Sequence, residues 1–109
     1  MAYDEKLAER VRRVLAANPS LTERKMFGGL SFMLAGNMCC GVVGEELVAR
    51  VGPERYEEVL ARPHARPMDF TGKPLTGFVY VAPEGHTTDR DLQDWIGMAE
   101  GFVRTLPAK

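Results

Sequence analysis

The chain has 109 residues, with 14 Lys and Arg against 15 Asp and Glu, which gives a net charge of −1 at pH 7. This length fits one domain that can bury a core without disulfides, and the apolar share of 45% is that of an ordinary globular protein. The near-neutral charge argues against a generic nucleic-acid binder, because such a protein needs a surplus of Lys and Arg to neutralise phosphates.

The first segment predicts a helix over about residues 4–17. Apolar residues recur there at helical spacing, and charged residues occupy most other positions. Asn18-Pro19 ends the pattern, because the residue before a proline avoids the helical conformation. We therefore expect a helix with one buried face.

Glycines then separate short apolar runs, which is typical of antiparallel strands joined by tight turns. We predict three strands in a meander: a long first strand from about Arg24 to Leu34, bent at Gly28-Gly29, and then strands over 38–43 and 47–51. A glycine pair inside a strand indicates a bulge or a close approach of two backbones.

Residues 53–61 predict a short helix, since Pro53 suits the first helical position. Strands over 67–70 and 77–81 follow. The last helix begins near Thr88, which with Asp91 resembles a capping box, and it ends at Pro107. Its apolar stripe is the clearest periodicity in the chain and consists of Leu92, Trp95, Ile96, Ala99, Val103 and Leu106. Gly97 and Gly101, four apart on this helix, either permit close packing or weaken it.

The order of elements is therefore α-β-β-β-α-β-β-α, in a single domain of residues 1–109. This order predicts a two-layer α+β fold, with three helices and a mainly antiparallel five-stranded sheet. Runs such as 38–43 and 78–81 are apolar at both alternating positions, although a two-layer fold covers only one face of its sheet. Either helices cover both faces of the sheet or a second copy of the chain covers the bare one, and we favour the homodimer.

The two cysteines and two histidines carry little catalytic signal. Cys39 and Cys40 are adjacent, so their side chains would point to opposite faces of a strand; we expect no disulfide and a reducing, cytoplasmic location. Nothing in the sequence places His64 or His86 beside a thiol, and the four residues lack the paired spacing of a zinc site. We predict no catalytic residue, no metal and no cofactor, and we find no signal peptide or membrane-spanning stretch.

The candidates for binding a ligand are basic residues and a glycine pair: Arg24, Lys25, Gly28, Gly29, Arg50, Arg66 and Lys73. The glycines could present backbone amides to an anion beside two cations, but a kinked strand explains them equally. Residues 67–74 end like a phosphate-binding loop, yet they lack its leading glycine, and Pro74 replaces the Ser or Thr. Between residues 50 and 73, carboxylates are interleaved with the basic side chains, which favours a salt-bridged surface.

The run Arg24-Lys25-Met26-Phe27-Gly28-Gly29-Leu30 resembles the opening motif of the TfoX/Sxy N-terminal domain family, a Met-Phe-Gly-Gly run after a basic residue. The resemblance continues through residues 36–43, 47–51, 66–74 and 77–81 and so covers nearly the whole chain. It implies an α+β fold like that of the secretion-chaperone-like group. It supplies no catalytic residues.

The named members of that family are bacterial regulators of natural competence that work with a cyclic-AMP-responsive transcription factor, and they carry a C-terminal domain resembling helix-hairpin-helix modules. The present sequence shows no such second domain. We therefore expect a stand-alone, non-enzymatic regulatory or protein-interaction domain with a protein partner that the sequence does not identify. One alternative is a nucleic-acid or transcription-complex accessory; another is a small-molecule- or anion-binding domain, or an enzyme, with a pocket near Gly28-Gly29 and Lys73.

Overall fold

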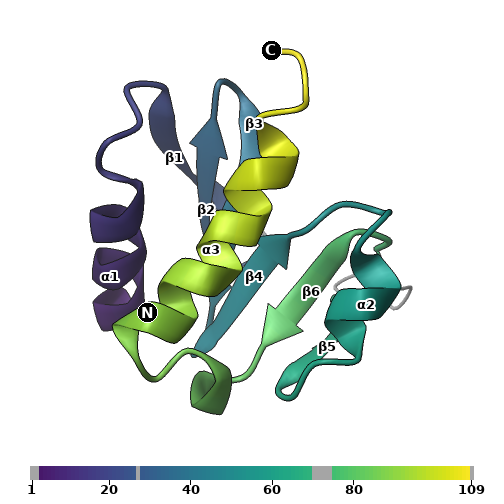
Figure 1. The fold of residues 1–109 in the computed structure, drawn as a ribbon. Helices are drawn as coiled ribbons and strands as arrows, with labels where there is room; N and C mark the ends of the chain where they lie inside the picture. The colour runs from purple at the N-terminus through teal and green to yellow at the C-terminus, as the bar shows by residue number, and fades with distance from the viewer. Residues whose placement is uncertain (1–2, 27, 70–74, 109) are drawn as a thin grey trace.

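The fold is a layer of helices on an antiparallel sheet, in a computed structural model that describes residues 3–26, 28–69 and 75–108 (Figure 1). In these ranges the elements are α1 (Glu5–Leu15), β1 (Leu21–Met26), β2 (Gly29–Leu34), β3 (Asn37–Val43), β4 (Glu46–Arg50), α2 (Tyr56–Leu60), β5 (Ala65–Pro67), β6 (Phe78–Val81), the 3-10 helix η1 (Pro83–Gly85) and α3 (Asp89–Val103). The six strands form one sheet in the order β1-β2-β3-β4-β6-β5, and every neighbouring pair is antiparallel. The predicted α+β class is confirmed.

The prediction of five strands is wrong, because the first predicted strand is two strands. Met26 pairs with Gly29, so the chain reverses between them instead of bending, and Gly28 takes a φ of 72° that glycine adopts without strain. The side chains of β1 from Thr22 to Lys25 are all polar and exposed. A strand at the edge of a sheet is commonly charged in this way, and such a strand has no apolar alternation to reveal it.

Two shorter elements also differ from their predicted bounds. The strand expected over 67–70 is β5 at Ala65–Pro67, and residue 70 lies outside the described ranges. The helix expected over 53–61 is limited to Tyr56–Leu60, because residues 53–55 form a turn ahead of it. The two long helices were predicted within a few residues.

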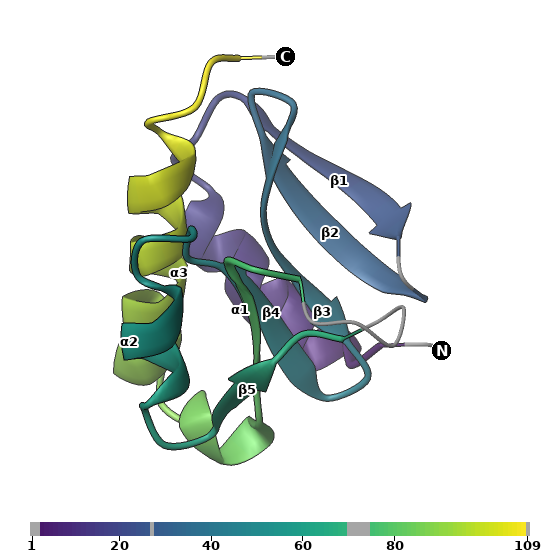
Figure 2. The same ribbon diagram turned by 90° about the vertical axis from the view of Figure 1, so that its right-hand side faces the viewer.

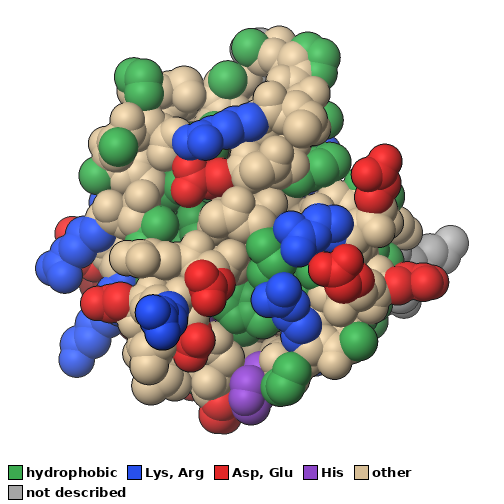
Figure 3. All heavy atoms as spheres, viewed as in Figure 1, with side chains coloured by type: hydrophobic (Ala, Val, Ile, Leu, Met, Phe, Trp, Pro, Cys, Tyr) green, Lys and Arg blue, Asp and Glu red, His purple; other side chains and the backbone are tan. Residues whose placement is uncertain are grey.

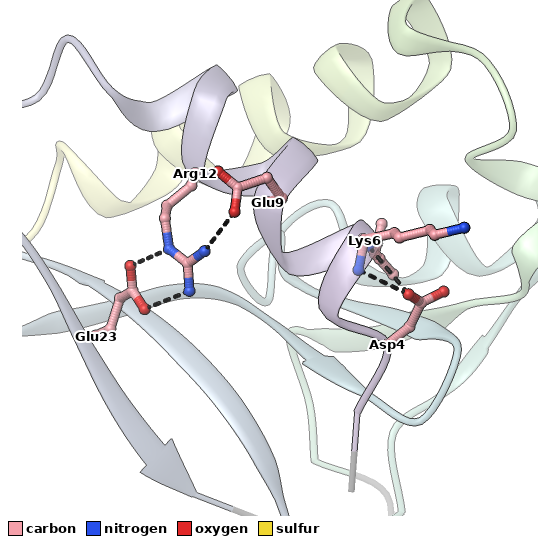
Figure 4. A network of polar contacts seen from close by, with 6 residues as sticks. Asp4, Lys6, Glu9, Arg12 and Glu23 are labelled. Carbon is pink, nitrogen blue, oxygen red and sulfur yellow. Dashed lines mark hydrogen bonds and ion pairs between the residues drawn. The ribbon is translucent and has the colours of Figure 1, made fainter. Parts of the chain in front are cut away.

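Side chains at the helix ends explain where α1 and α3 begin. The Asp4 carboxylate accepts hydrogen bonds from the amides of Lys6 and Leu7, and the Thr88 hydroxyl accepts one from the amide of Asp91. Farther along α1, Arg12 donates to Glu23 at 2.6 and 2.9 Å and so ties the helix to the edge strand β1 (Figure 4).

All three helices contribute to one core on one side of the sheet. Buried residues of α1 and α3 share a cluster with Val59 of α2 and with alternate residues of the strands, among them Phe32, Val42 and Leu47. Figure 2 shows α2 and α3 on the same side of the sheet. The two-layer arrangement predicted from the element order is therefore present.

The second face of the sheet is covered in part by the chain itself. Met68, which follows β5, is fully buried there beside Met38, Val48 and Tyr80. Burial of these residues explains why the runs 38–43 and 78–81 are apolar at both alternating positions. A strip of half-buried apolar side chains remains around them: Met33, Val43, Leu75 and Phe78. No helix in the described ranges has the length and apolarity needed to cross a bilayer.

Candidate functional site

The glycine pair at the start of β2 has a structural role. A Cβ atom on Gly29 would lie 2.1 Å from the carbonyl oxygen of Val42 on the neighbouring strand β3, so no side chain fits there. A Cβ on Gly28 would meet no atom within 4 Å. The close approach of two backbones that the sequence suggested at this pair is therefore present at Gly29.

The basic candidates near the glycines stand at one edge of the sheet. Arg24 and Lys25 lie on β1 with exposed side chains, and among the described residues neither has a carboxylate within 4.0 Å. Arg66 lies on β5 at the opposite edge, five strands away, which corresponds to roughly 24 Å. The structure does not bring these cations together, and Lys73 lies outside the described residues.

Arg50 and Arg66 are held by contacts within the chain. Arg66 forms two hydrogen bonds with the Glu46 carboxylate, and its guanidinium lies 4.5 Å from the centre of the Tyr80 ring. The Arg50 guanidinium lies 5.3 Å from the ring centre of Phe78 and 5.4 Å from that of Phe102. Together with the ion pair between Arg55 and Glu58, these contacts match the salt-bridged surface predicted for this segment.

The adjacent cysteines lie in the main core, and both belong to the same cluster under the helices. The expectation that they face opposite sides of the sheet is wrong, because the register between β2 and β3 shifts: Phe32 pairs with Cys40, but Met33 pairs with Met38. This β-bulge leaves Cys39 as the extra residue. The hydrogen bond with Cys39 and burial raise the pKa of the Cys40 thiol well above its ordinary value.

The two histidines are both held by backbone contacts. His64 has a φ of 71°, uncommon for a residue with a side chain, and its carbonyl accepts a hydrogen bond from the amide of Ala82 at 2.9 Å. His86 is buried, and its Nε2 donates to the carbonyl of Glu45 at 3.0 Å. His86 therefore links the loop before α3 to the turn between β3 and β4.

A first cavity lies beside the C-terminal half of α3. It has a volume of about 510 Å³ and is bounded by the loop of residues 51–55 on one side and by α3 on the other. Met98 and Phe102 contribute apolar surface, while Gly97 and Gly101 leave the helix wall without side chains. A Cβ on either glycine would meet no atom within 4 Å. Packing within the chain therefore does not require a glycine at either position.

A second cavity, of about 460 Å³, lies beside the N-terminal half of α3. The loop of residues 62–64 and the 3-10 helix η1 form its other walls. Trp95 lies at this cavity with its indole Nε1 donating to the carbonyl of Gly85 at 3.0 Å. The Arg62 guanidinium lies 5.6 Å from the centre of the Trp95 ring, which is the geometry of a cation–π contact.

Both cavities use the same face of α3. The α3 residues that line them follow helical spacing: Asp91, Asp94, Trp95, Gly97, Met98, Gly101 and Phe102. From Asp91 to Phe102 this face runs for about 16 Å along the helix axis. Figure 3 shows hydrophobic side chains between α3 and α2 on this side of the molecule, flanked by basic and acidic ones. We call these two cavities and the α3 face between them the α2–α3 groove, after α3 and the loops on either side of α2 that line it.

Two features of the sequence belong to this groove, but neither indicates a site by itself. Trp95 is part of the apolar stripe of α3 and keeps 6% of its surface exposed, and Gly97 and Gly101 lie on the same helix. The opposite wall comes from residues 51–55 and 62–64, some 40 positions earlier in the chain. Periodicity within α3 cannot show which segment lies beside it.

Fold and groove together define a two-layer α+β domain whose helical layer has two cavities between α3 and the loops on either side of α2. The family model of the TfoX N-terminal domain matches residues 13–102, and the chain belongs to this family. The resemblance seen around the Met-Phe-Gly-Gly run is thereby confirmed. A search of curated proteins finds none that matches the chain.

Proposed function

We propose that this chain is a non-enzymatic regulatory domain that acts by binding another protein at the α2–α3 groove. The observation that carries the proposal is the groove itself, two cavities on one face of α3. Large concave surfaces with apolar floors and polar rims are the usual sites of recognition. Gly97 and Gly101 support this function, because they keep the groove open although the fold would accept a side chain at both positions.

The chemistry of Cys40 argues against a cysteine nucleophile. A cysteine nucleophile needs a lowered pKa, and the pKa of Cys40 is shifted in the opposite direction. Both cysteines are free and fully buried, which fits the reducing cytoplasm that we propose as the location.

A nucleic-acid accessory is a second candidate, favoured by the exposed Arg24 and Lys25 on β1. Other arginines are engaged with carboxylates, among them Arg12 with Glu23 and Arg66 with Glu46. A phosphate-binding surface needs several free cations together, so the protein partner is preferred. A binding titration with duplex DNA at two salt concentrations separates the two functions, because phosphate contacts give a steep dependence on salt.

A second copy of this chain is the other protein partner that we consider. The half-buried strip around Met33, Val43 and Phe78 favours it, although Met68 already covers part of that sheet face. Light scattering over a range of concentrations tests it directly. If the chain formed a dimer and Val43→Lys dissociated it, the dimer contact would lie on the sheet face and not in the groove.

Site-specific photo-cross-linking tests the proposed function. A photoreactive phenylalanine analogue replaces Thr105, which lines the first cavity, or Gln93, an exposed α3 residue outside both cavities. In cells of the source organism, we expect a discrete protein adduct from position 105 and none from 93. The added substitution Gly101→Leu should abolish it by filling the groove. Equal adducts from both positions, or none from position 105, would contradict the proposal.

A further inference from the structure

The two ends of the α2–α3 groove differ in charge. Glu84, Asp91 and Asp94 line the second cavity, and its basic residues are Arg62 and His64. The first cavity has one Glu and one Arg, so its charges balance, and the rest of its lining is glycine, threonine and apolar side chains. A ligand that fits the whole groove must therefore be cationic at one end and apolar at the other.

The carboxylates at the acidic end are available to a partner. Within the described residues, none of Glu84, Asp91 and Asp94 has a basic side chain within 4.0 Å. All three residues are exposed, and no three acidic, histidine or cysteine side chains in those ranges gather as a metal site. Their charge suits an extended cationic group better than a single ion.

The chain's own Arg62 shows that a cation fits at this end. Its guanidinium lies over the Trp95 ring in a cavity that also contains the acidic residues. Aromatic faces attract ammonium and guanidinium groups, and nearby carboxylates add to that attraction. A Lys or Arg from a partner would lie next to Arg62 and meet the carboxylates of the same cavity.

The distance between the two ends matches two turns of a helix. Asp94 and Gly101 are seven positions apart on α3, a distance of about 10 Å along the axis. A partner helix lying along α3 repeats its contact face at the same interval. The two glycine positions also lack side chains, so a partner backbone can come close to α3 there.

Building on the proposed function, we infer that the α2–α3 groove binds an amphipathic helix of a partner protein. The helix inserts a large apolar side chain beside Gly101 and Phe102, and two turns away it places a Lys or Arg against the carboxylates of Asp91 and Asp94. Recognition by apolar anchors in a groove, with charges at the rim that fix the register, is a known mode of peptide binding.

Synthetic peptides test this inference, with Trp95 as the reporter because it is the only tryptophan of the chain. Three helical, tryptophan-free peptides of about 18 residues are titrated, a length that gives helicity in water. The first carries Leu and, seven positions away, Lys; the second has Glu for that Lys, and the third has Ser for the Leu. We expect the first to change the Trp95 emission and to bind about tenfold more tightly than either of the others.

Variants of the domain assign that binding to the groove. Gly101→Leu should remove it by filling the first cavity, and Asp94→Lys should reverse the preference between Lys and Glu peptides. The matched controls are Gln93→Leu and Glu57→Lys, exposed positions outside the groove that should leave binding unchanged. Melting curves of every variant confirm that it is folded.

Three results would overturn the inference: no binding of the Leu–Lys peptide, equal binding of all three peptides, or binding that survives Gly101→Leu. If one of these results were found although position 105 gave cross-links in cells, the proposed function would stand and only the helical, cationic partner would be rejected. Loss of the cross-links would reject both. Self-association that Gly101→Leu abolishes would instead make a second copy the occupant.

Discussion

The Arg62 guanidinium covers one face of the Trp95 ring, with its central carbon 5.6 Å from the ring centre. The edge of the same indole is fixed by the hydrogen bond to the carbonyl of Gly85. Trp95 is thus held by one polar contact and covered by another, each from a different segment of the chain. Because Arg62 lines the second cavity and lies over the ring, it limits how closely a ligand can approach Trp95.

Replacing Arg62 with alanine should expose Trp95. We expect acrylamide to quench Trp95 fluorescence more strongly in Arg62→Ala, while the free energy of unfolding falls by no more than about 1 kcal/mol, since exposed cation–π contacts are weak. Stern–Volmer slopes and urea unfolding measure the two effects. Arg90→Ala, an exposed α3 residue outside both cavities, is the control and should leave the slope unchanged. Equal slopes for the wild type and Arg62→Ala would show that Arg62 does not cover the ring.

Alanine at Gly97 or Gly101 should stabilise the domain. Both glycines are exposed in α3, an added Cβ meets no atom within 4 Å, and glycine costs up to about 1 kcal/mol relative to alanine in a helix interior. We expect each substitution to raise the free energy of unfolding by about 0.5–1 kcal/mol. Chemical denaturation of the single and double variants measures it, and the two effects should add.

Gly52 is the contrasting position on the wall of the same groove. Its φ is 90°, and a Cβ there would lie 2.4 Å from a ring carbon of Phe102. Gly52→Ala should therefore lower the free energy of unfolding by at least about 1–2 kcal/mol. If Gly97→Ala and Gly52→Ala changed the free energy of unfolding in the same direction, the packing described for this groove would be wrong.

The parts of the fold that the sequence predicted are those set by local periodicity. The stripe of α3 repeats every 3.6 residues, and Trp95, Ile96 and Ala99 are buried as it indicated. β1 was not separated from β2, and its first residues were left out, because its exposed residues at a sheet edge carry no alternation. The bulge that places Cys39 and Cys40 in one core was missed because pairing between strands is set across the sheet.

The groove was beyond prediction for a related reason. Its walls combine α3 with loops at residues 51–55 and 62–64, and only the tertiary packing sets them side by side. The candidate residues chosen from charge alone, such as Arg24 and Arg66, lie at opposite edges of the sheet. Charge along a chain indicates which residues are at the surface, but it does not indicate which of them meet.

The ion pair between Arg12 and Glu23 should make stability depend on pH in the acid range. The hydrogen bonds from Arg12 lower the pKa of Glu23 below its ordinary value, so the folded state binds this proton less readily than the unfolded state. The stabilisation is therefore complete above the unfolded value of about 4.3 and is lost as the pH falls through the lower folded pKa.

Glu23→Gln measures that contribution. Because both side chains are about a third exposed, we expect the variant to be less stable than the wild type by under about 1 kcal/mol at pH 7. The difference should shrink toward zero in strong acid, where Glu23 is protonated. Urea unfolding at several pH values gives the curve, with Gln93→Ala, an exposed substitution that changes no charge, as the control. A difference that grows on acidification would contradict this assignment.

Alanine at Gly29 should be far more damaging than alanine at its neighbour. The added Cβ would lie 2.1 Å from the Val42 carbonyl oxygen, within a paired part of the sheet, so the strands must separate. We expect a loss of about 3 kcal/mol or more, against about 1 kcal/mol for Gly28→Ala, which has open space and only the cost of its φ. Thermal melts of the two variants compare them. Similar small losses of stability for both variants would mean that packing does not require Gly29, and a role in binding an anion would again explain it.

The cysteine pair should be inert in the folded protein. Both thiols are fully buried, and the pKa of Cys40 is raised by its hydrogen bond with Cys39 and by burial, so the thiolate that attacks a disulfide reagent is disfavoured. We expect 5,5′-dithiobis(2-nitrobenzoate) at about pH 8, near the ordinary thiol pKa, to label the native protein only as fast as it unfolds. Ala17→Cys introduces an exposed thiol that should react at once and so verifies the reagent.

Because unfolding limits the rate, a destabilising substitution such as Gly52→Ala should accelerate labelling of the buried pair while leaving the rate at position 17 unchanged. Rapid labelling of Cys39 or Cys40 in the unsubstituted protein would instead mean that the core opens at the bulge without unfolding, and a reactive thiol would then have to be considered.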